Sequence, residues 1–260
     1  MNLGKTHFQR QRCYWITFKT NSNSEKFINR IKQLKINGYF REGSYVNEIF
    51  CDGRRVLFPK INFTRNCFWI YNAVITDVKK YLETNKPKSE KPCAAVLWNR
   101  EMRNFSGKIT ATDIDCAYWR IAFLKKYIRE QTYIKGLEIE DKSMRNSSIS
   151  NLHSHKQWYV IKDGEITKKN FFITKPDSYS IIYDDIRYSC YKLMKDLSLQ
   201  LGNDFICYKV DCIYYVDTKK NRKLVQDFLN KKNMDWKQLE EPHIKKNHKK
   251  EKHENTDVIN

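Results

Sequence analysis

The stretch YKVDCIYY, residues 208–215, joins two apolar runs at residues 205–208 and 212–216 through a very tight connection. Short runs rich in aromatic and β-branched residues around so few polar positions predict a β-hairpin with Asp211 in its turn. The stretch TDIDCAYW, residues 112–119, ends a predicted strand at residues 108–114 and leads into a predicted helix at residues 117–129. Asp113 therefore stands at the end of one predicted strand, and Asp211 stands at the turn of a predicted hairpin.

The segments on either side of these stretches predict an α+β chain. Further strands are expected at residues 13–20, 45–51, 55–58, 67–74, 93–98, 158–162 and 165–174. Further helices are expected from Ser24, at residues 77–83, from about Lys142, at residues 179–201 and at residues 222–230. The fold class that we expect is α+β, with a mixed, largely antiparallel sheet and helices packed on one face.

A polar, proline-punctuated segment at residues 84–92 is the best candidate for an internal boundary. It predicts an N-terminal α+β region at residues 1–92 and a second domain at residues 93–239. The remaining segment, residues 240–260, is expected to be a disordered charged tail.

The chain carries 49 Lys and Arg against 30 Asp and Glu among its 260 residues, a formal net charge of +19. The tail contributes nothing to this excess, because its five lysines are matched by five carboxylates. A basic folded body interleaved with Tyr and Trp is expected to bind a polyanion, since phosphate binding releases counterions. The alternative is a solvated lysine-rich surface without such a partner.

The sequence shows no membrane or export signal. No apolar run approaches the roughly 18 residues that a membrane span needs, and residues 1–12 lack the apolar stretch of a signal peptide. The eight cysteines are scattered singly without C-x-x-C spacing, which favours buried reduced thiols over a zinc site or disulfides. We therefore expect a cytoplasmic protein with no membrane partner.

Three segments together carry residues suited to phosphoryl transfer: residues 112–119, 142–150 and 208–215. Two carboxylates on adjacent strands, Asp113 and Asp211, can share Mg²⁺ ions that bridge the attacking and leaving oxygens. Lys142 and Arg145 on a facing helix can neutralise a triphosphate. A tyrosine beside the metal aspartate, Tyr118, can lie under a sugar. Nucleotidyl transfer requires such a set.

These segments resemble the palm domain of family B DNA polymerases, above all the compact protein-primed enzymes of phages and mobile elements. Residues 113–120 follow the motif D-x-x-S-L-Y-P-S at Asp113 and Tyr118. Residues 142–150 match K-x-x-x-N-S-x-Y-G at Lys142, Asn146 and the following serine, and residues 209–212 keep the second aspartate of D-T-D-S. The likeness covers about residues 93–217.

The resemblance implies a palm-like fold and a template-directed, two-metal DNA polymerase activity that uses Mg²⁺ or Mn²⁺. Asp113 and Asp211 are then metal ligands with Asp115 assisting, and Tyr118 checks the sugar. Lys142, Arg145 and Asn146 bind the nucleotide. The implied partners are DNA rather than RNA, nucleoside triphosphates and other replication proteins, and the implied compartment of a phage-encoded chain is the host cytoplasm.

The chain departs from the family pattern in three respects. Lys209 replaces the first carboxylate of D-T-D-S, and an ammonium there can pair with Asp113 or Asp211 and weaken metal binding. Only 29 positions separate Asp113 from Lys142, too few for the usual fingers, and the chain after Asp217 is too short for a full thumb. The pattern is therefore that of a reduced palm.

Other interpretations of the same residues remain open. A non-catalytic nucleic-acid-binding protein could retain the palm-like fold, and Asp113, Glu140 and Lys142 imitate the metal-dependent nuclease pattern D…E-x-K. Each residue also has an ordinary structural role. Asp113 could cap the following helix, Asp211 could form a turn and Tyr118 could be a core aromatic residue. The residues of 142–146 could form a solvated helix face.

Overall fold

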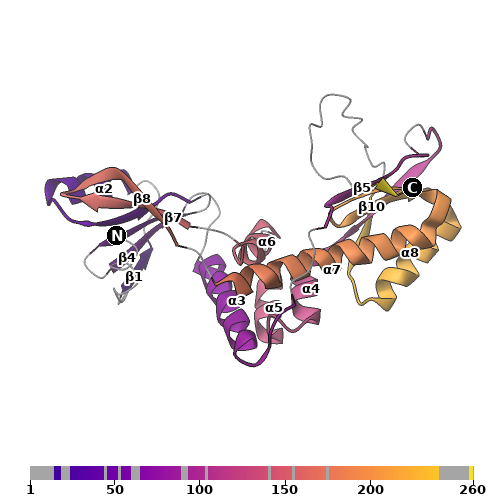
Figure 1. The fold of residues 1–260 in the computed structure, drawn as a ribbon, viewed down its shortest axis with the longest axis horizontal. Helices are drawn as coiled ribbons and strands as arrows, with labels where there is room; N and C mark the ends of the chain where they lie inside the picture. The colour runs from indigo at the N-terminus through magenta and orange to yellow at the C-terminus, as the bar shows by residue number, and fades with distance from the viewer. Residues whose placement is uncertain are drawn as a thin grey trace. The chain divides into compact units, whose positions relative to one another are not determined.

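The computed structural model of the chain describes residues 15–18, 24–43, 46–51, 54–59, 65–88, 93–102, 105–139, 142–153, 156–173, 176–239 and 258–259. These residues form helices and two β-sheets, distributed over two compact units (Figure 1). Unit 1 comprises residues 1–76 and 134–180, and unit 2 comprises residues 77–133 and 181–260. The α+β class with largely antiparallel strands is confirmed, with the strands divided between two sheets.

The division between the units falls within three helices: α3 (Arg65–Thr84), α5 (Glu130–Leu137) and α7 (Asp177–Leu201). Each unit is therefore built from two chain segments, and the units do not coincide with the expected regions 1–92 and 93–239. The division into regions 1–92 and 93–239 stays a prediction. The expected disorder of the tail concerns residues outside the described ones, except for the short strand β12 (Val258–Ile259).

Unit 1 contains a six-stranded sheet in the order β1-β4-β3-β2-β7-β8, with the helix α6 (Lys142–Ser150) in the same unit. The strands are β1 (Trp15–Phe18), β2 (Gly38–Arg41), β3 (Val46–Cys51), β4 (Arg54–Pro59), β7 (Lys156–Lys162) and β8 (Glu165–Ile173). On one face, Ile31 of the helix α2 (Ser24–Gln33) joins a buried cluster with Ile49 and Phe58. On the other, Phe50 and Trp158 belong to an aromatic cluster. The sheet thus has an apolar core on both faces.

The helix α3 corrects one prediction. Residues 67–74 were expected to form a strand and residues 77–83 a short helix, but both lie within α3. Ile70, Val74 and Val78, four residues apart, are buried, whereas Trp69 is 62% exposed. The apolar run at residues 67–71 has the composition of a buried strand. In the helix only one stripe of apolar residues faces the core, and this stripe is enough to anchor the helix there.

Unit 2 contains a six-stranded sheet in the order β11-β6-β10-β9-β5-β12. Its other strands are β5 (Val96–Asn99), β6 (Ile109–Ile114), β9 (Phe205–Lys209), β10 (Cys212–Val216) and β11 (Trp236–Leu239). The helix α4 (Ala117–Leu124) follows β6, and α8 (Lys219–Lys231) connects β10 to β11. The strands β6, β9, β10 and β11, with antiparallel neighbours in the order β11-β6-β10-β9, have the split β-α-β arrangement. The connection from β6 to β9 includes α4, α7 and the unit 1 segment at residues 134–180.

One face of this sheet is buried against helices (Figure 1). Ile114, Ile213 and Tyr208 on that face are at most 1% exposed, as alternation along each strand requires. Tyr208 meets Tyr191 of α7 edge to face, with ring centroids 6.3 Å apart. The helices thus leave the other face of the sheet to carry partly exposed side chains.

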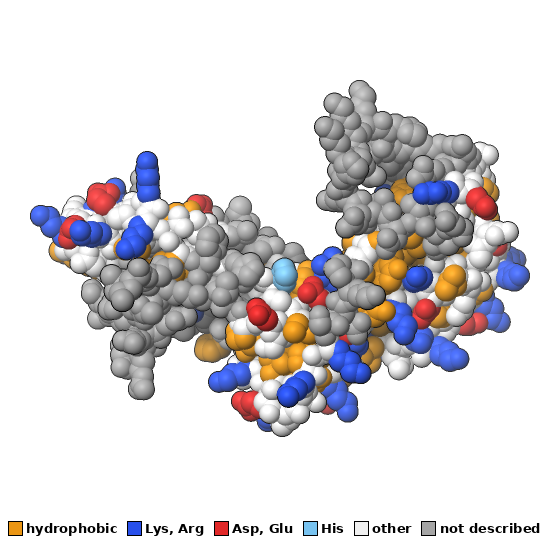
Figure 2. Space-filling model, viewed as in Figure 1, with side chains coloured by type: hydrophobic (Ala, Val, Ile, Leu, Met, Phe, Trp, Pro, Cys, Tyr) orange, Lys and Arg blue, Asp and Glu red, His pale blue; other side chains and the backbone are white. Residues whose placement is uncertain are grey.

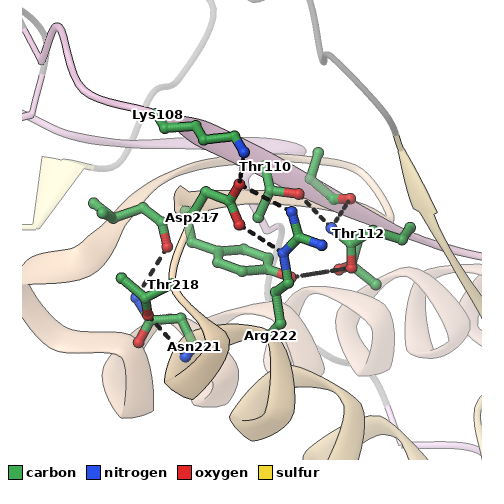
Figure 3. Close-up of polar contacts among 11 residues, drawn as sticks. Lys108, Thr110, Thr112, Asp217, Thr218, Asn221 and Arg222 are labelled. Carbon is green, nitrogen blue, oxygen red and sulfur yellow. Dashed lines mark hydrogen bonds and ion pairs between the residues drawn. The ribbon is translucent and has the colours of Figure 1, made fainter.

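The register between β6 and β10 is reinforced by polar contacts at the far end of the hairpin (Figure 3). Asp217, which follows β10, accepts hydrogen bonds from Arg222 Nε at 2.6 Å and Nη2 at 2.9 Å and pairs with Lys108 at 3.3 Å. Thr218 caps α8 by accepting from the Asn221 backbone N–H at 3.1 Å. These contacts fix the strands that carry the candidate site at their other end.

Candidate functional site

Asp113 lies near the end of β6, and Asp211 lies in the β9–β10 turn beside that end. Asp113 of β6 is paired with Cys212 of β10 in the antiparallel register. The Ile114 N–H donates to the backbone carbonyl of Asp211 at 2.9 Å. Both carboxylates also act on the Cys212 thiol, whose pKa is raised to about 11, chiefly by burial. The register therefore places the backbones of Asp113 and Asp211 beside each other, at the end of β6 and in the turn before β10.

The hairpin turn that carries Asp211 has an unusual backbone. Lys209 pairs with Cys212, so the turn consists of Val210 and Asp211, and Val210 has a φ of 56°. A β-branched residue in the left-handed region costs about 1–3 kcal/mol, and such strain persists where the surroundings fix it. The Val210 N–H donates to Ala95 O at 2.6 Å, and its carbonyl accepts from Cys190 Sγ at 3.5 Å. The strained turn is therefore held from both sides.

A row of paired residues crosses the partly exposed face beside this turn. Lys237 pairs with Asp113, Asp113 with Cys212, and Cys212 with Lys209, so their side chains share one face. Lys237 Nζ lies 3.1 Å from Asp113 Oδ2, with the two side chains 51% and 25% exposed. Asp113 is therefore ion-paired in the absence of a ligand.

Lys209 is surrounded by aromatic rings. Its Nζ lies 5.5 Å from the ring centroid of Trp98 and 6.0 Å from that of Tyr214. Both rings are partly exposed and lie on the same face as the row from Lys237 to Lys209. A cation between two aromatic faces is a feature of surfaces that stack bases and contact phosphates.

The segment after β6 does not use Asp113 as a cap. The N-cap of α4 is Cys116, with φ 51°, and no side chain caps the helix. The capping role that was left open for Asp113 is therefore wrong. The Asp115 N–H donates to Asp235 O at 2.8 Å, and its carboxylate accepts from the Cys116 thiol at 3.6 Å.

Tyr118 faces α7 close to the hairpin turn. Its ring meets that of Tyr183 edge to face at 6.4 Å, and burial raises the pKa of its hydroxyl. It interacts with the Cys190 thiol, whose pKa is in turn raised by burial and by Asp211. Tyr118 is thus linked to Asp211 through Cys190 of α7.

The predicted nucleotide-binding residues of α6 belong to unit 1. Lys142 and Asn146 are exposed. Arg145 is only 5% exposed, and its Nη1 donates to Gly136 O at 3.1 Å and Ile139 O at 2.6 Å. The Arg145 guanidinium thus hydrogen-bonds backbone carbonyls at the C-terminal end of α5, and we assign Arg145 a structural role. The second carboxylate of the nuclease pattern, Glu140, lies outside the described residues.

Two residues at this site, Lys237 and Trp98, were not predicted as site residues. Lys237 lies on β11, an unpredicted strand whose four residues, WKQL, alternate only briefly. Trp98 was placed on a predicted strand but without a partner. Pairing between strands, which single-segment patterns do not encode, brings both to the site.

In comparisons with known proteins, no family model, curated protein or solved structure matches the chain. Among the described residues, no group of three or more His, Cys, Asp and Glu side chains is arranged to hold a metal ion. None of the described helices is both long and apolar enough to cross a membrane.

Proposed function

We propose that unit 2 is the reduced palm of a DNA polymerase-like nucleotidyltransferase of the phage or mobile-element kind. The observation that carries the proposal is the β6–β10 register, which makes the backbones of Asp113 and Asp211 neighbours at one end of these strands. The split β-α-β path around these strands supports it, because the resemblance drawn from the sequence requires such a core.

Two carboxylates fit a Mg²⁺ or Mn²⁺ site of the substrate-assisted type. Mg²⁺ is commonly held by one or two carboxylates together with substrate phosphates and water, so a complete cage of protein ligands is not needed. Asp113 and Asp211 would hold the ion, with Asp115 nearby. When bound, the ion would supply polarisation of the phosphoryl oxygens.

The remaining side chains have roles in binding. Tyr118, beside the turn that carries Asp211, would contact the sugar of the nucleotide. Lys142 and Asn146, which are exposed on α6, belong to unit 1, so their part in nucleotide binding stays a prediction from the sequence and the site proposed in unit 2 does not include them. Trp98, Lys209 and Tyr214 would hold the DNA by stacking and by charge.

The basic character of the chain agrees with a DNA partner. Several exposed lysines lie on α8, and Figure 2 shows several basic side chains over this part of the surface. Contacts between such lysines and phosphates make binding weaken as salt is added.

A second candidate, a non-catalytic nucleic-acid-binding protein with the same fold, is favoured by one observation. Two lysines, Lys237 and Lys209, share the face of Asp113, and Lys237 is already paired with it. A positive charge at this distance opposes the binding of a divalent cation.

Primer extension by the full-length chain tests the proposal, with Mg²⁺ or Mn²⁺, a primed DNA template and deoxynucleoside triphosphates. We expect extension by the wild-type chain, loss of extension in Asp113→Asn and Asp211→Asn, and normal extension in Asp227→Asn. Asp227 is an exposed aspartate of α8 and controls for the loss of one negative charge.

Two outcomes would overturn the proposal. Salt-sensitive DNA binding without extension with either metal would support the non-catalytic protein. Cleavage of DNA that needs Asp113 but not Asp211 would support the nuclease.

A further inference from the structure

Unit 1 contains a cluster of charged residues on one face of its sheet, far along the chain from the aspartates of unit 2. Glu48 of β3 lies among Arg41 of β2, Arg55 of β4 and Lys156 of β7, and Tyr71 of α3 lies against Lys156. We name these five residues the Glu48 cluster. All of them belong to unit 1.

Both carboxylate oxygens of Glu48 are engaged by arginines. Arg41 Nη2 donates to Oε1, and Arg55 donates to Oε2 through Nη2 and through Nε, the latter at 2.7 Å. The Glu48 side chain is 2% exposed, whereas those of Arg41 and Arg55 are 13% and 25% exposed. The carboxylate is thus enclosed, and the two arginine side chains are partly exposed.

Lys156 adds a third cation to this single carboxylate. Its Nζ lies 4.7 Å from the ring centroid of Tyr71. Burial, together with Arg41 and Arg55, lowers the pKa of Lys156 to about 8, although Glu48 opposes the change. Glu48 therefore compensates the positive charge only in part.

The formal charge of the cluster is +2, from three cations and one carboxylate. Desolvating a charge is costly unless an opposite charge compensates it, so a purely structural ion pair needs one arginine rather than three cations. A surplus of cations, two of them partly exposed arginines, favours the binding of a phosphate group.

We infer that the Glu48 cluster is a phosphate-binding site, which takes the phosphate group of a nucleotide or of a nucleic acid. Glu48 orients the two guanidinium groups, and the ammonium of Lys156 supplies the additional charge. The bound phosphate neutralises the surplus. This inference does not rest on the proposed function, because it involves none of the residues of unit 2.

The first test measures how fast Lys156 is acetylated by an amine-reactive ester at pH 8 in the full-length chain, with each lysine followed by peptide mass spectrometry. A bound phosphate that raises the pKa of this amine by one unit lowers its unprotonated fraction about fivefold at that pH. We therefore expect about fivefold slower labelling of Lys156 with ligand and unchanged labelling of the exposed Lys168 of β8.

Four probes at matched ionic strength distinguish the sources of the phosphate: inorganic phosphate, a deoxynucleoside triphosphate, and one oligodeoxynucleotide with a 5′-phosphate or a 5′-hydroxyl end. Protection by the first two identifies a free phosphate or nucleotide. Protection by the phosphorylated oligonucleotide alone identifies a terminal phosphate, and equal protection by both oligonucleotides identifies the phosphodiester backbone. No protection by any probe, or equal slowing at Lys156 and Lys168, overturns the inference.

The second test uses two variants with the same change of charge. Lys156→Gln is expected to weaken binding of the protecting probe about tenfold, the effect of losing one charge-assisted contact of about 1.4 kcal/mol. Lys168→Gln is expected to bind within about twofold of the wild type. Equal affinities of the two variants would refute the site. Arg41 and Arg55 are left intact because each compensates the buried Glu48.

Discussion

Replacement of Glu48 by glutamine tests how much the buried carboxylate contributes to the stability of unit 1. Burial alone would raise the pKa of Glu48, but Arg55, Lys156 and Arg41 together lower it to about 2 from an ordinary value of 4.5. A difference of about 2.5 pKa units corresponds to about 3 kcal/mol of unfolding free energy at pH 7. Because the Glu48 side chain is 2% exposed, solvent screening removes little of this contribution.

The pH dependence has a definite sign. The folded-state pKa is lowered, so the stabilisation is complete above the unfolded-state value and is lost as the pH falls towards about 2. Glutamine has the shape of a protonated glutamate. The difference between the wild type and Glu48→Gln should therefore be about 3 kcal/mol at pH 7 and less than half of that at about pH 3.

Urea denaturation followed by tryptophan fluorescence at several pH values measures this difference. If the two units unfold in separate transitions, the change belongs to the transition of unit 1. Glu165→Gln is the matched control, because its ion pair with Lys32 is 3.2 Å long but both side chains are largely exposed, and we expect a loss below about 0.5 kcal/mol. A loss below about 1 kcal/mol in Glu48→Gln, or one independent of pH, would refute the argument.

Three further changes have definite expected outcomes. Thr218→Ala removes the cap of α8 and should lower the unfolding free energy by about 1 kcal/mol in urea denaturation, whereas an unchanged midpoint would contradict the capping role. Lys237→Gln should lower the dissociation constant for Mn²⁺, measured by calorimetry, by about two- to threefold, since exposed pairs are weak, and a higher constant would contradict the site. Trp98→Leu should weaken binding of single-stranded DNA, measured by fluorescence anisotropy, by about tenfold, and unchanged affinity would exclude stacking on this ring.

The sequence allowed the hairpin at residues 205–216 and the strand that ends in Asp113 to be predicted nearly to the residue. Their apolar runs are short, and turn or helix signals bound them, so local pattern was sufficient. The same method failed at residues 67–74 because an apolar run in one stripe of a long helix has the composition of a buried strand.

The candidate site was predictable only in part for a related reason. Asp113 and Asp211 could be proposed as neighbours because each ends an element. Lys237 meets Asp113 only through the pairing of β11 with β6, which depends on tertiary structure. Arg145 shows the converse, since its sequence context suits a phosphate contact while its guanidinium is occupied by two backbone carbonyls.

The two lysines beside Asp113 differ in what they imply for metal binding. Lys237 is 51% exposed, and an exposed ion pair is worth about 0.2–1 kcal/mol, so a divalent cation with its phosphate ligands displaces it at small cost. Lys209 lies between the rings of Trp98 and Tyr214, and its charge therefore stays on this face. A fixed ammonium beside the aspartates repels a bare cation but attracts the phosphates that bring the cation with them. Metal binding at this edge should therefore depend on the nucleotide, with weak affinity for Mn²⁺ alone and stronger affinity when a triphosphate is present.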